Sequence, residues 1–285
     1  MDLSIIIVNY KTKELTSNCI DSIYESNLKG IDYEILVVDN ASNDGSIESI
    51  EVRFPKVKSI KNNENLGFSK ANNIGMKQSS GDYILLLNSD TIVEIMTIRK
   101  SLEFMRNHQH VGALGCKIVL ESGELDAACK RSFPTPMNGI YHTLKLDRRF
   151  PKSHRFGEYN LTYINPDKTF SVDCIMGAYM MVTREMVKIV GLLDEDYFMY
   201  GEDVDWCYRI KKAGFQIIYY PEVRIFHYKK ASGIGKRNPK VIEAFYDSML
   251  IFYKKHYKHQ YNSFTTWCVF SGTKMMKKRA LRKNK

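Results

Sequence analysis

The sequence predicts an α/β fold in which a mostly parallel sheet carries helices on both faces. Three observations lead to this prediction. Short apolar runs such as Leu3–Asn9 and Tyr33–Asp39 show no polar alternation, as in strands that are buried on both faces. Segments with helical spacing of apolar residues alternate with these runs. Polar and often acidic residues follow directly where several of the runs end.

The alternation starts at the first strand, Leu3–Asn9, and a helix over 13–27 follows it, because Leu15, Cys19 and Ile23 have helical spacing. Later elements of the first half are the strand Tyr33–Asp39, a short helix around Ile47, a weaker strand over 57–63, a helix over 66–81, a buried strand over 83–87, a helix over 96–106 and a strand over 111–120. This order predicts a parallel, doubly wound sheet in the first 120 residues.

The second half is less regular. Residues 121–170 are rich in proline, asparagine, tyrosine and basic residues, and we expect loops there, with room for a hairpin. The remaining predicted elements are a strand-like run over 170–184, a helix over 202–214, two short strands over 215–221 and 223–228, and a helix over 241–257.

Composition excludes several classes of protein. The 285 residues are 44% hydrophobic and 26% charged, which indicates a globular chain with a sizeable core. No run approaches the roughly 20 apolar residues of a membrane-spanning helix, and the acidic start lacks the features of a signal peptide, so we expect a cytoplasmic protein. The six cysteines are scattered without a CxxC pair and are expected to be reduced thiols.

The net charge of +10 lies entirely in the last segment of the chain. Residues 248–285 contain ten basic and no acidic residues, which leaves 32 basic residues to balance 32 acidic ones. Because a nucleic-acid-binding protein would carry its basic residues across the folded body, we expect no nucleic-acid partner. Aromatic residues are interspersed among the lysines and arginines of residues 248–285. We expect 241–255 to pack on the domain or on a second subunit, and the part after about Lys258 to contact a membrane surface.

Two strand ends carry polar residues that suit a binding site. Asp39 ends one strand, and Asn88, Ser89 and Asp90 follow another. A turn at Asp39 and a helix cap at Asp90 are the structural alternatives. Ligands of open parallel sheets bind beyond the carboxyl ends of the strands, where the Asp39 carboxylate can accept the imide N–H of a uracil or thymine.

A third acidic cluster, Glu202, Asp203 and Asp205, is followed by Arg209. Crowded carboxylates can raise the pKa of one member, as a general base needs, although acids also favour the first turn of a helix. His227 ends a separate apolar run. Such a histidine is often a core residue, but together with a strand-end carboxylate it suits Mg²⁺ or Mn²⁺. No Walker or GxGxxG sequence follows a strand, so a nucleotide phosphate here would need a cation.

Six motifs in this order resemble the family 2 glycosyltransferases of the GT-A fold, and among them the bacterial rhamnosyltransferase-like branch. The motifs are SIIIVNY at 4–10, VVDNASNDGS at 37–46, NNENLGFSKANNIGMKQSSGDYILLLNSD at 62–90, GAYMMVTRE at 177–185, GLLDEDYFMYGEDVDWCYR at 191–209 and VRIFHY at 223–228. The resemblance implies a catalytic domain over 1–235, with a nucleotide-binding half (1–120) and an acceptor half (121–235), and a helical tail over 236–285.

The resemblance also implies roles for single residues. Asp203 would be the catalytic base, with Glu202 as the alternative, and Asp90 would be the main metal-binding carboxylate. Asn88 departs from the aspartate that the family often has there, which puts metal affinity and metal choice in doubt. The further implied contacts are His227 and Asn88 for the metal; Val8, Asn9, Asp39, Asn65, Gly67, Asn72 and Ser89 for the nucleotide or donor; and Gly177, Ala178 and Arg209 near the sugar or acceptor.

The expected reaction is an inverting transfer of a sugar, with L-rhamnose from dTDP-β-L-rhamnose as the preferred donor and another sugar from a UDP-sugar as the alternative. The acceptor would be a glycan or a polyprenyl-diphosphate-linked glycan in bacterial cell-surface polysaccharide synthesis, at the inner face of the membrane. A sugar nucleotidyltransferase would carry a glycine-rich basic loop where this chain has NYKTKEL. A non-catalytic nucleotide-binding module is the other alternative, and a dimer remains open.

Overall fold

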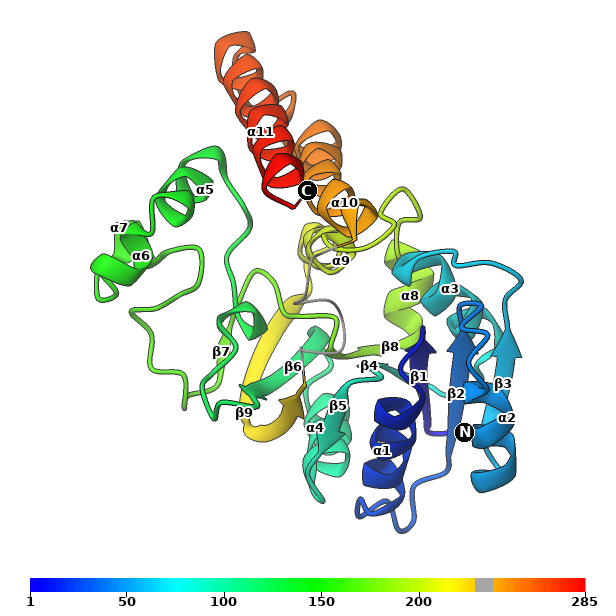
Figure 1. Cartoon of the computed structure of the whole chain (residues 1–285). Coiled ribbons are helices and arrows are strands. Elements are labelled where there is room, and N and C mark those ends of the chain that lie inside the picture. Colours follow the sequence, from blue (N-terminus) through cyan, green and yellow to red (C-terminus); the bar gives the residue numbers. More distant parts are fainter. Residues whose placement is uncertain (229–237, 285) are drawn as a thin grey trace.

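The computed structural model describes residues 1–228 and 238–284. Within them the strands form one mixed sheet in the order β3-β2-β1-β4-β8-β6-β9-β5, and β7 pairs with β9 (Figure 1). The strands are β1 Leu3–Asn9, β2 Tyr33–Asp39, β3 Lys58–Lys61, β4 Tyr83–Asn88, β5 Thr91–Val93, β6 Val111–Leu120, β7 Phe170–Ser171, β8 Tyr179–Thr183 and β9 Gln216–His227.

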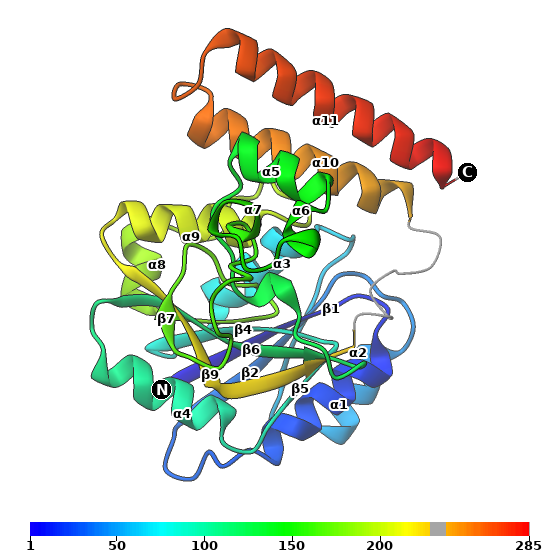
Figure 2. The same ribbon diagram turned by 90° about the vertical axis from the view of Figure 1, so that its left-hand side faces the viewer.

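Helices cover both faces of this sheet, as the sequence predicts. Figure 2 shows α1 and α4 on one face and α3, α8 and α9 on the other, with α10 and α11 stacked beyond α9. The helices are α1 Lys13–Tyr24, α2 Ser46–Arg53, α3 Phe68–Gln78, α4 Thr97–Asn107, the 3₁₀ turn η1 Ala127–Cys129, α5 Pro136–Thr143, α6 Leu146–Arg149, α7 His154–Gly157, α8 Arg184–Val190, α9 Glu202–Lys212, α10 Pro239–Phe252, the π-helical turn η2 Tyr253–Tyr257 and α11 Ser263–Lys283.

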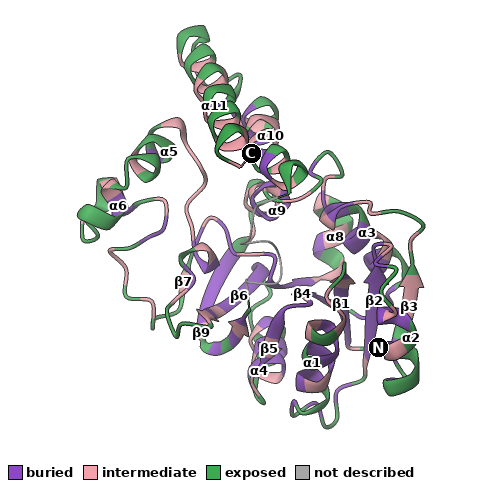
Figure 3. Cartoon of the chain, viewed as in Figure 1, coloured by how far each residue is buried: buried purple, intermediate pink, exposed green. Residues whose placement is uncertain are grey.

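The first half of the sheet brings three strand ends to one edge. β1 pairs in parallel with both β2 and β4, so that Asn9 lies opposite Asp39 and Val8 lies opposite Asn88. The apolar residues between these ends are buried, and Figure 3 shows the buried core running along the sheet. The core therefore fixes the polar strand ends relative to one another.

The structure differs from the prediction in the second half of the sheet. The first 120 residues do not form a parallel sheet by themselves, because β8 inserts between β4 and β6 and is antiparallel to both. The two strands predicted over 215–221 and 223–228 are one continuous strand, β9, whose register against β6 shifts after Cys116. The predicted loop region 121–170 contains the helices α5, α6 and α7, and α6 and α7 have only four residues each, too few for a periodic apolar pattern.

The carboxyl-terminal helices form an antiparallel pair on the outer side of α9. Lys277 on α11 reaches Asp247 on α10 at 2.8 Å, and Tyr253 Oη lies 2.9 Å from Thr266 Oγ1.

Among the described residues, no helix combines the length and apolar character needed to cross a membrane. The predicted domain boundary between residues 235 and 236 lies outside the described residues.

Candidate active site

A buried hydrogen-bond network holds Asp39 at the shared strand edge. Asn9 Nδ2 donates to Asp39 Oδ1 at 2.6 Å, and the Ser42 amide donates to Asp39 Oδ2 at 3.0 Å. Asn9 is held in turn by the hydroxyls of Thr12 and Thr16, at 2.9 and 2.7 Å from its Oδ1. A carboxylate oxygen can accept more than one hydrogen bond, so Oδ2 keeps capacity for a ligand donor.

The segment before α3 forms a rim next to this network. Asn65 Oδ1 accepts from the Gly67 amide at 3.0 Å, and Asn72 Nδ2 donates to the Phe68 carbonyl at 3.0 Å. The Phe68 amide donates to the carbonyl of Phe198 at 2.7 Å, which joins the rim to the segment before α9. Asn72 is buried, and this hydrogen bond supports the start of α3, while its predicted contact with the donor stays a prediction.

Two glycines of the predicted site differ in what a side chain would meet. Gly67 has φ +84°, and a Cβ there would lie 2.4 Å from the Phe198 carbonyl oxygen, whereas a Cβ at Gly177 would make only ordinary contacts of 3.6 Å or more. We expect Gly67→Ala to lower the free energy of unfolding by about 1–3 kcal/mol. Gly177→Ala is the matched control and should melt close to the parent protein in a thermal denaturation experiment. Equal melting temperatures for the two variants would contradict the tight approach at Gly67.

Asp90 and His227 meet at the end of β4. β5 pairs antiparallel with β9 and places Thr91 opposite His227, so the turn after β4 lies against the end of β9. His227 Nε2 is 3.1 Å from Asp90 Oδ1, and both side chains are buried. Within the described residues, Asp90 Oδ2 and Asn88 Oδ1 are buried oxygens without a hydrogen-bond partner.

These oxygens fit a divalent cation. A buried acceptor without a donor costs free energy, which a cation bound there removes. Oxygen ligands with one imidazole suit Mg²⁺ or Mn²⁺. The described residues do not contain three acidic, histidine or cysteine side chains gathered closely enough to hold a metal alone, so water and phosphate oxygens would complete the coordination.

Asp126 is a neighbour of this site that the sequence did not predict. It is buried after the end of β6, and its Oδ2 lies 3.8 Å from His227 Nδ1. Asp126 Oδ1 also accepts from the Ala128 amide at 3.1 Å, at the start of η1. The residue stands six positions after the strand end, in a segment without a clear pattern, so no sequence signal pointed to it.

The third acidic cluster begins α9 on the other side of β8. Asp203 Oδ2 accepts from Arg131 Nη2 at 2.7 Å and is 3.4 Å from the Gly177 amide, while Asp203 Oδ1 accepts from the Val204 amide at 2.8 Å. The next residue after Gly177 binds the end of β4, because the Ala178 carbonyl accepts from the Asn88 amide at 3.0 Å. The chain thus connects Asp203 with the cation site through one short segment.

Glu202 and Asp203 are chemically different. Burial raises the pKa of Glu202 to about 8, and the charge of Asp203 adds to the shift. Glu202 is therefore mostly neutral at pH 7, and its Oε2 is buried without a hydrogen-bond partner in the described residues. Arg131 donates a hydrogen bond to Asp203 and orients its carboxyl group. Arg131 lies in the irregular segment 121–170, so the sequence did not reveal this partner.

Arg209 holds α9 in place. Its Nε donates to Asp205 Oδ2 at 2.8 Å, and its Nη2 donates to the Leu192 carbonyl at 2.9 Å. Burial raises the pKa of Asp205, but hydrogen bonds from His256 and the charge of Arg209 outweigh it, so the net pKa is lowered. These contacts tie α9 to the segment after α8 and give Arg209 a supporting role, and its predicted place near the acceptor stays a prediction.

Comparison with known proteins decides the family. A family model described as "Glycosyltransferase like family 2" matches residues 2–240. The chain belongs to glycosyltransferase family 2. This confirms the family and the α/β fold class that the sequence predicts.

Individual relatives agree with this assignment. The N-acetylglucosaminyl-diphospho-decaprenol L-rhamnosyltransferase of Mycobacterium tuberculosis is 28% identical over 229 residues, which cover 76% of this chain and 73% of the relative. The mannosyltransferase PcManGT from Pyrobaculum calidifontis, solved with GDP-Man and Mn²⁺, has a TM-score of 0.61 at 17% identity and covers 88% of this chain. TarS 1–349 of S. aureus, solved with UDP-GlcNAc, has a TM-score of 0.56 at 18% identity and also covers 88%. This chain covers 64% and 65% of those two solved chains.

Proposed function

We propose that this family 2 glycosyltransferase is a metal-dependent, inverting enzyme that transfers L-rhamnose from dTDP-β-L-rhamnose to a hydroxyl of a lipid-linked glycan. One observation carries the proposal. Within the described residues, Asp90 Oδ2 and Asn88 Oδ1 are buried without a hydrogen-bond partner, Asp90 lies next to His227, and the segment Gly177–Ala178 joins Asn88 to the carboxyl group of Asp203. A cation site next to a base is what displacement of a nucleoside diphosphate by a hydroxyl requires.

In the proposed reaction, Asp203 takes the proton of the acceptor hydroxyl while that oxygen bonds to the anomeric carbon. The bond from this carbon to the phosphate oxygen breaks on the opposite face, so the configuration inverts and the nucleoside diphosphate leaves. Arg131 keeps the Asp203 carboxylate directed into the site. Mg²⁺ or Mn²⁺, held by Asp90, His227 and Asn88, would neutralise the negative charge of the leaving diphosphate.

The donor is proposed to be a pyrimidine nucleotide sugar because of Asp39. Its carboxylate can accept the imide N–H of thymine or uracil, and Asn9 and Ser42 hold it in position. Related folds bind both kinds of base, since PcManGT was solved with GDP-Man and TarS 1–349 with UDP-GlcNAc, so the base preference rests on this residue. The rhamnosyl part of the proposal is supported by the name of the mycobacterial relative, and a UDP-sugar is the alternative donor.

Calorimetry with a panel of nucleoside diphosphates tests this donor assignment. We expect dTDP and UDP to bind in the presence of Mn²⁺ and GDP and ADP to bind at least tenfold more weakly. Asp39→Ala should weaken dTDP binding by about tenfold or more, because one charge-assisted hydrogen bond contributes roughly 1.5–3 kcal/mol. Ser80→Ala is the control, because Ser80 contacts β2 at Glu34, at the opposite end of the strand from Asp39. Tight binding of GDP by the parent protein would contradict the assignment.

The acceptor is proposed to be a polyprenyl-diphosphate-linked glycan at the inner face of the cell membrane, which the mycobacterial relative's name supports. The basic tail would bring the enzyme to that surface, since Lys and Arg residues near anionic lipid each contribute on the order of 1 kcal/mol. We further propose that residues 1–235 are the catalytic unit and that the tail is an attachment element whose first part, α10 and η2, packs on α9.

A further inference from the structure

The outer side of α11 exposes aromatic residues that the fold does not use. Phe264 and Trp267 are 72% and 64% exposed. The neighbouring side of the same helix packs on α10 and η2, where Phe270 lies against the Tyr253 ring and Thr266 contacts the Tyr253 hydroxyl. Packing within the domain therefore explains one side of α11 and leaves the other to a partner.

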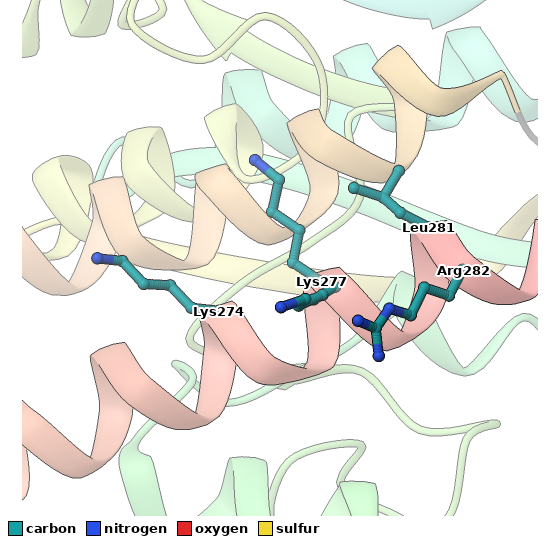
Figure 4. Close-up of a pocket in the computed structure, with 5 residues that line it drawn as sticks. Lys274, Lys277, Leu281 and Arg282 are labelled. Atoms are coloured by element: carbon teal, nitrogen blue, oxygen red, sulfur yellow. The ribbon is translucent and has the colours of Figure 1, made fainter.

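Basic residues continue this outer side toward the carboxyl end. Lys274, Lys278 and Arg282 follow Phe264 and Trp267 at helical spacing and are exposed. No acidic side chain of the described residues lies within ion-pair distance of these three, whereas Lys277 is turned inward and paired with Asp247. Figure 4 shows Lys277 and Leu281 directed toward α10 and Arg282 directed away from it. We call the set Phe264, Trp267, Lys274, Lys278 and Arg282 the α11 face.

A second amphipathic face lies on α5 and the start of α6. Met137, Ile140 and Leu144 are spaced by three and four residues and are each at least half exposed. The exposed Lys145 and Arg148 follow them directly. We call these five residues the α5 face. Figures 1 and 2 show α5, α6 and α11 on the same side of the molecule, beyond the sheet face that α9 covers.

We propose that the α11 face and the α5 face form one surface that binds an anionic lipid bilayer. Aromatic and aliphatic side chains beside a basic run suit the bilayer interface, where apolar groups enter to headgroup depth and cations meet anionic lipid. A second copy of this chain fits less well, because pairing α11 faces would bring basic residues against basic residues. This inference rests on the proposed lipid-linked acceptor, and it adds the surface and the lipid charge that would bring the enzyme to it.

Trp267 makes the proposal directly measurable. The chain has two tryptophans, and the other, Trp206, is completely buried in α9. With the full-length protein, vesicles of phosphatidylcholine and phosphatidylglycerol (3:1) should shift the tryptophan emission to shorter wavelength. Vesicles of phosphatidylcholine alone should not, and Trp267→Phe should lose the shift while it still sediments with the anionic vesicles.

Substitutions separate the two faces. We expect Lys278→Glu with Arg282→Glu to lower the fraction bound to anionic vesicles at least tenfold, and Ile140→Ser with Leu144→Ser to lower it severalfold. Val52→Ser is the matched control, because Val52 is an 85% exposed apolar residue on α2, and it should bind like the parent protein. Turnover with a short water-soluble acceptor, measured without vesicles, should be unchanged in all of these variants.

Several results would overturn the proposal. The first is unchanged emission from Trp267 with anionic vesicles. The second is equal loss of binding in the Val52→Ser control, and the third is an α5 variant that binds like the parent protein, since the proposal needs both faces. A dimer in light scattering that protects Trp267 without vesicles would assign α11 to a second copy. Vesicle binding without any donor turnover would leave this surface standing and remove the proposed enzymatic function.

Discussion

Asp203→Asn is expected to lower kcat by roughly 10²–10⁴-fold and to leave the affinity for the nucleoside diphosphate unchanged, because a general base acts only in the transition state. The substitution keeps the shape of the side chain, and its remaining oxygen can still accept from Arg131 and the Gly177 amide, while the hydrogen bond from the Val204 amide is lost. The fold should therefore persist, and the loss should appear in kcat. Steady-state kinetics together with calorimetry of dTDP binding separate the two effects.

Glu202→Gln is the matched control for this prediction. Because burial raises the pKa of Glu202 to about 8, the side chain is mostly neutral at pH 7, and glutamine resembles that neutral form. We expect the variant to keep kcat within a few-fold at pH 7. In the parent enzyme, ionisation of Glu202 above pH 8 adds a negative charge next to Asp203 and should change the rate, while the variant's pH–rate profile should stay flat through this range. An inactive Glu202→Gln beside an active Asp203→Asn would make Glu202 the base.

Asp90→Ala is expected to weaken Mn²⁺ binding in the presence of dTDP by about 100-fold or more and to remove nearly all turnover. The protein should stay folded, because the substitution removes the contact of Asp90 Oδ1 with His227, while Oδ2 has no hydrogen-bond partner to lose within the described residues. His227→Ala should have a smaller effect in the same direction. Electron paramagnetic resonance of free and bound Mn²⁺ measures the affinity independently of activity.

Glu94→Gln is the control for the loss of one negative charge. Glu94 directly follows β5, four residues after Asp90, and its carboxylate pairs with Arg224. This variant should bind Mn²⁺ like the parent protein. Chelator should abolish turnover, and added Mg²⁺ or Mn²⁺ should restore it. An Asp90→Ala enzyme that is fully active in excess chelator would contradict the cation site.

The sequence predicts the strands of the first half well, because each is buried on both faces and reads as one apolar run. The predicted bounds of β1 and β2 agree with the structure. β5 has three residues, and α6 and α7 have four each, so no period can be read from them. The position of β8 between β4 and β6 depends on long-range pairing, which a local pattern does not contain.

The residues of the candidate site likewise divide into those that a local sequence pattern predicts and those that only tertiary packing places. Asp90, His227 and Asp203 stand at element ends, where topology alone predicts a shared edge. Arg131 lies in an irregular segment and reaches the site only through tertiary packing. The motif around Arg209 predicts its neighbourhood but not the direction of its side chain, which is set by Asp205 and the loop before α9.

The most direct test of the central claim is the product released when the purified protein meets a nucleotide sugar and an acceptor. Phosphorus and proton NMR would follow dTDP-β-L-rhamnose, and UDP-sugars in parallel, with Mn²⁺ and a short polyprenyl-diphosphate-linked glycan. The account predicts release of the nucleoside diphosphate together with a glycoside of inverted anomeric configuration. Release of pyrophosphate during turnover with a nucleoside triphosphate and a sugar phosphate, or no turnover with any donor, would contradict it.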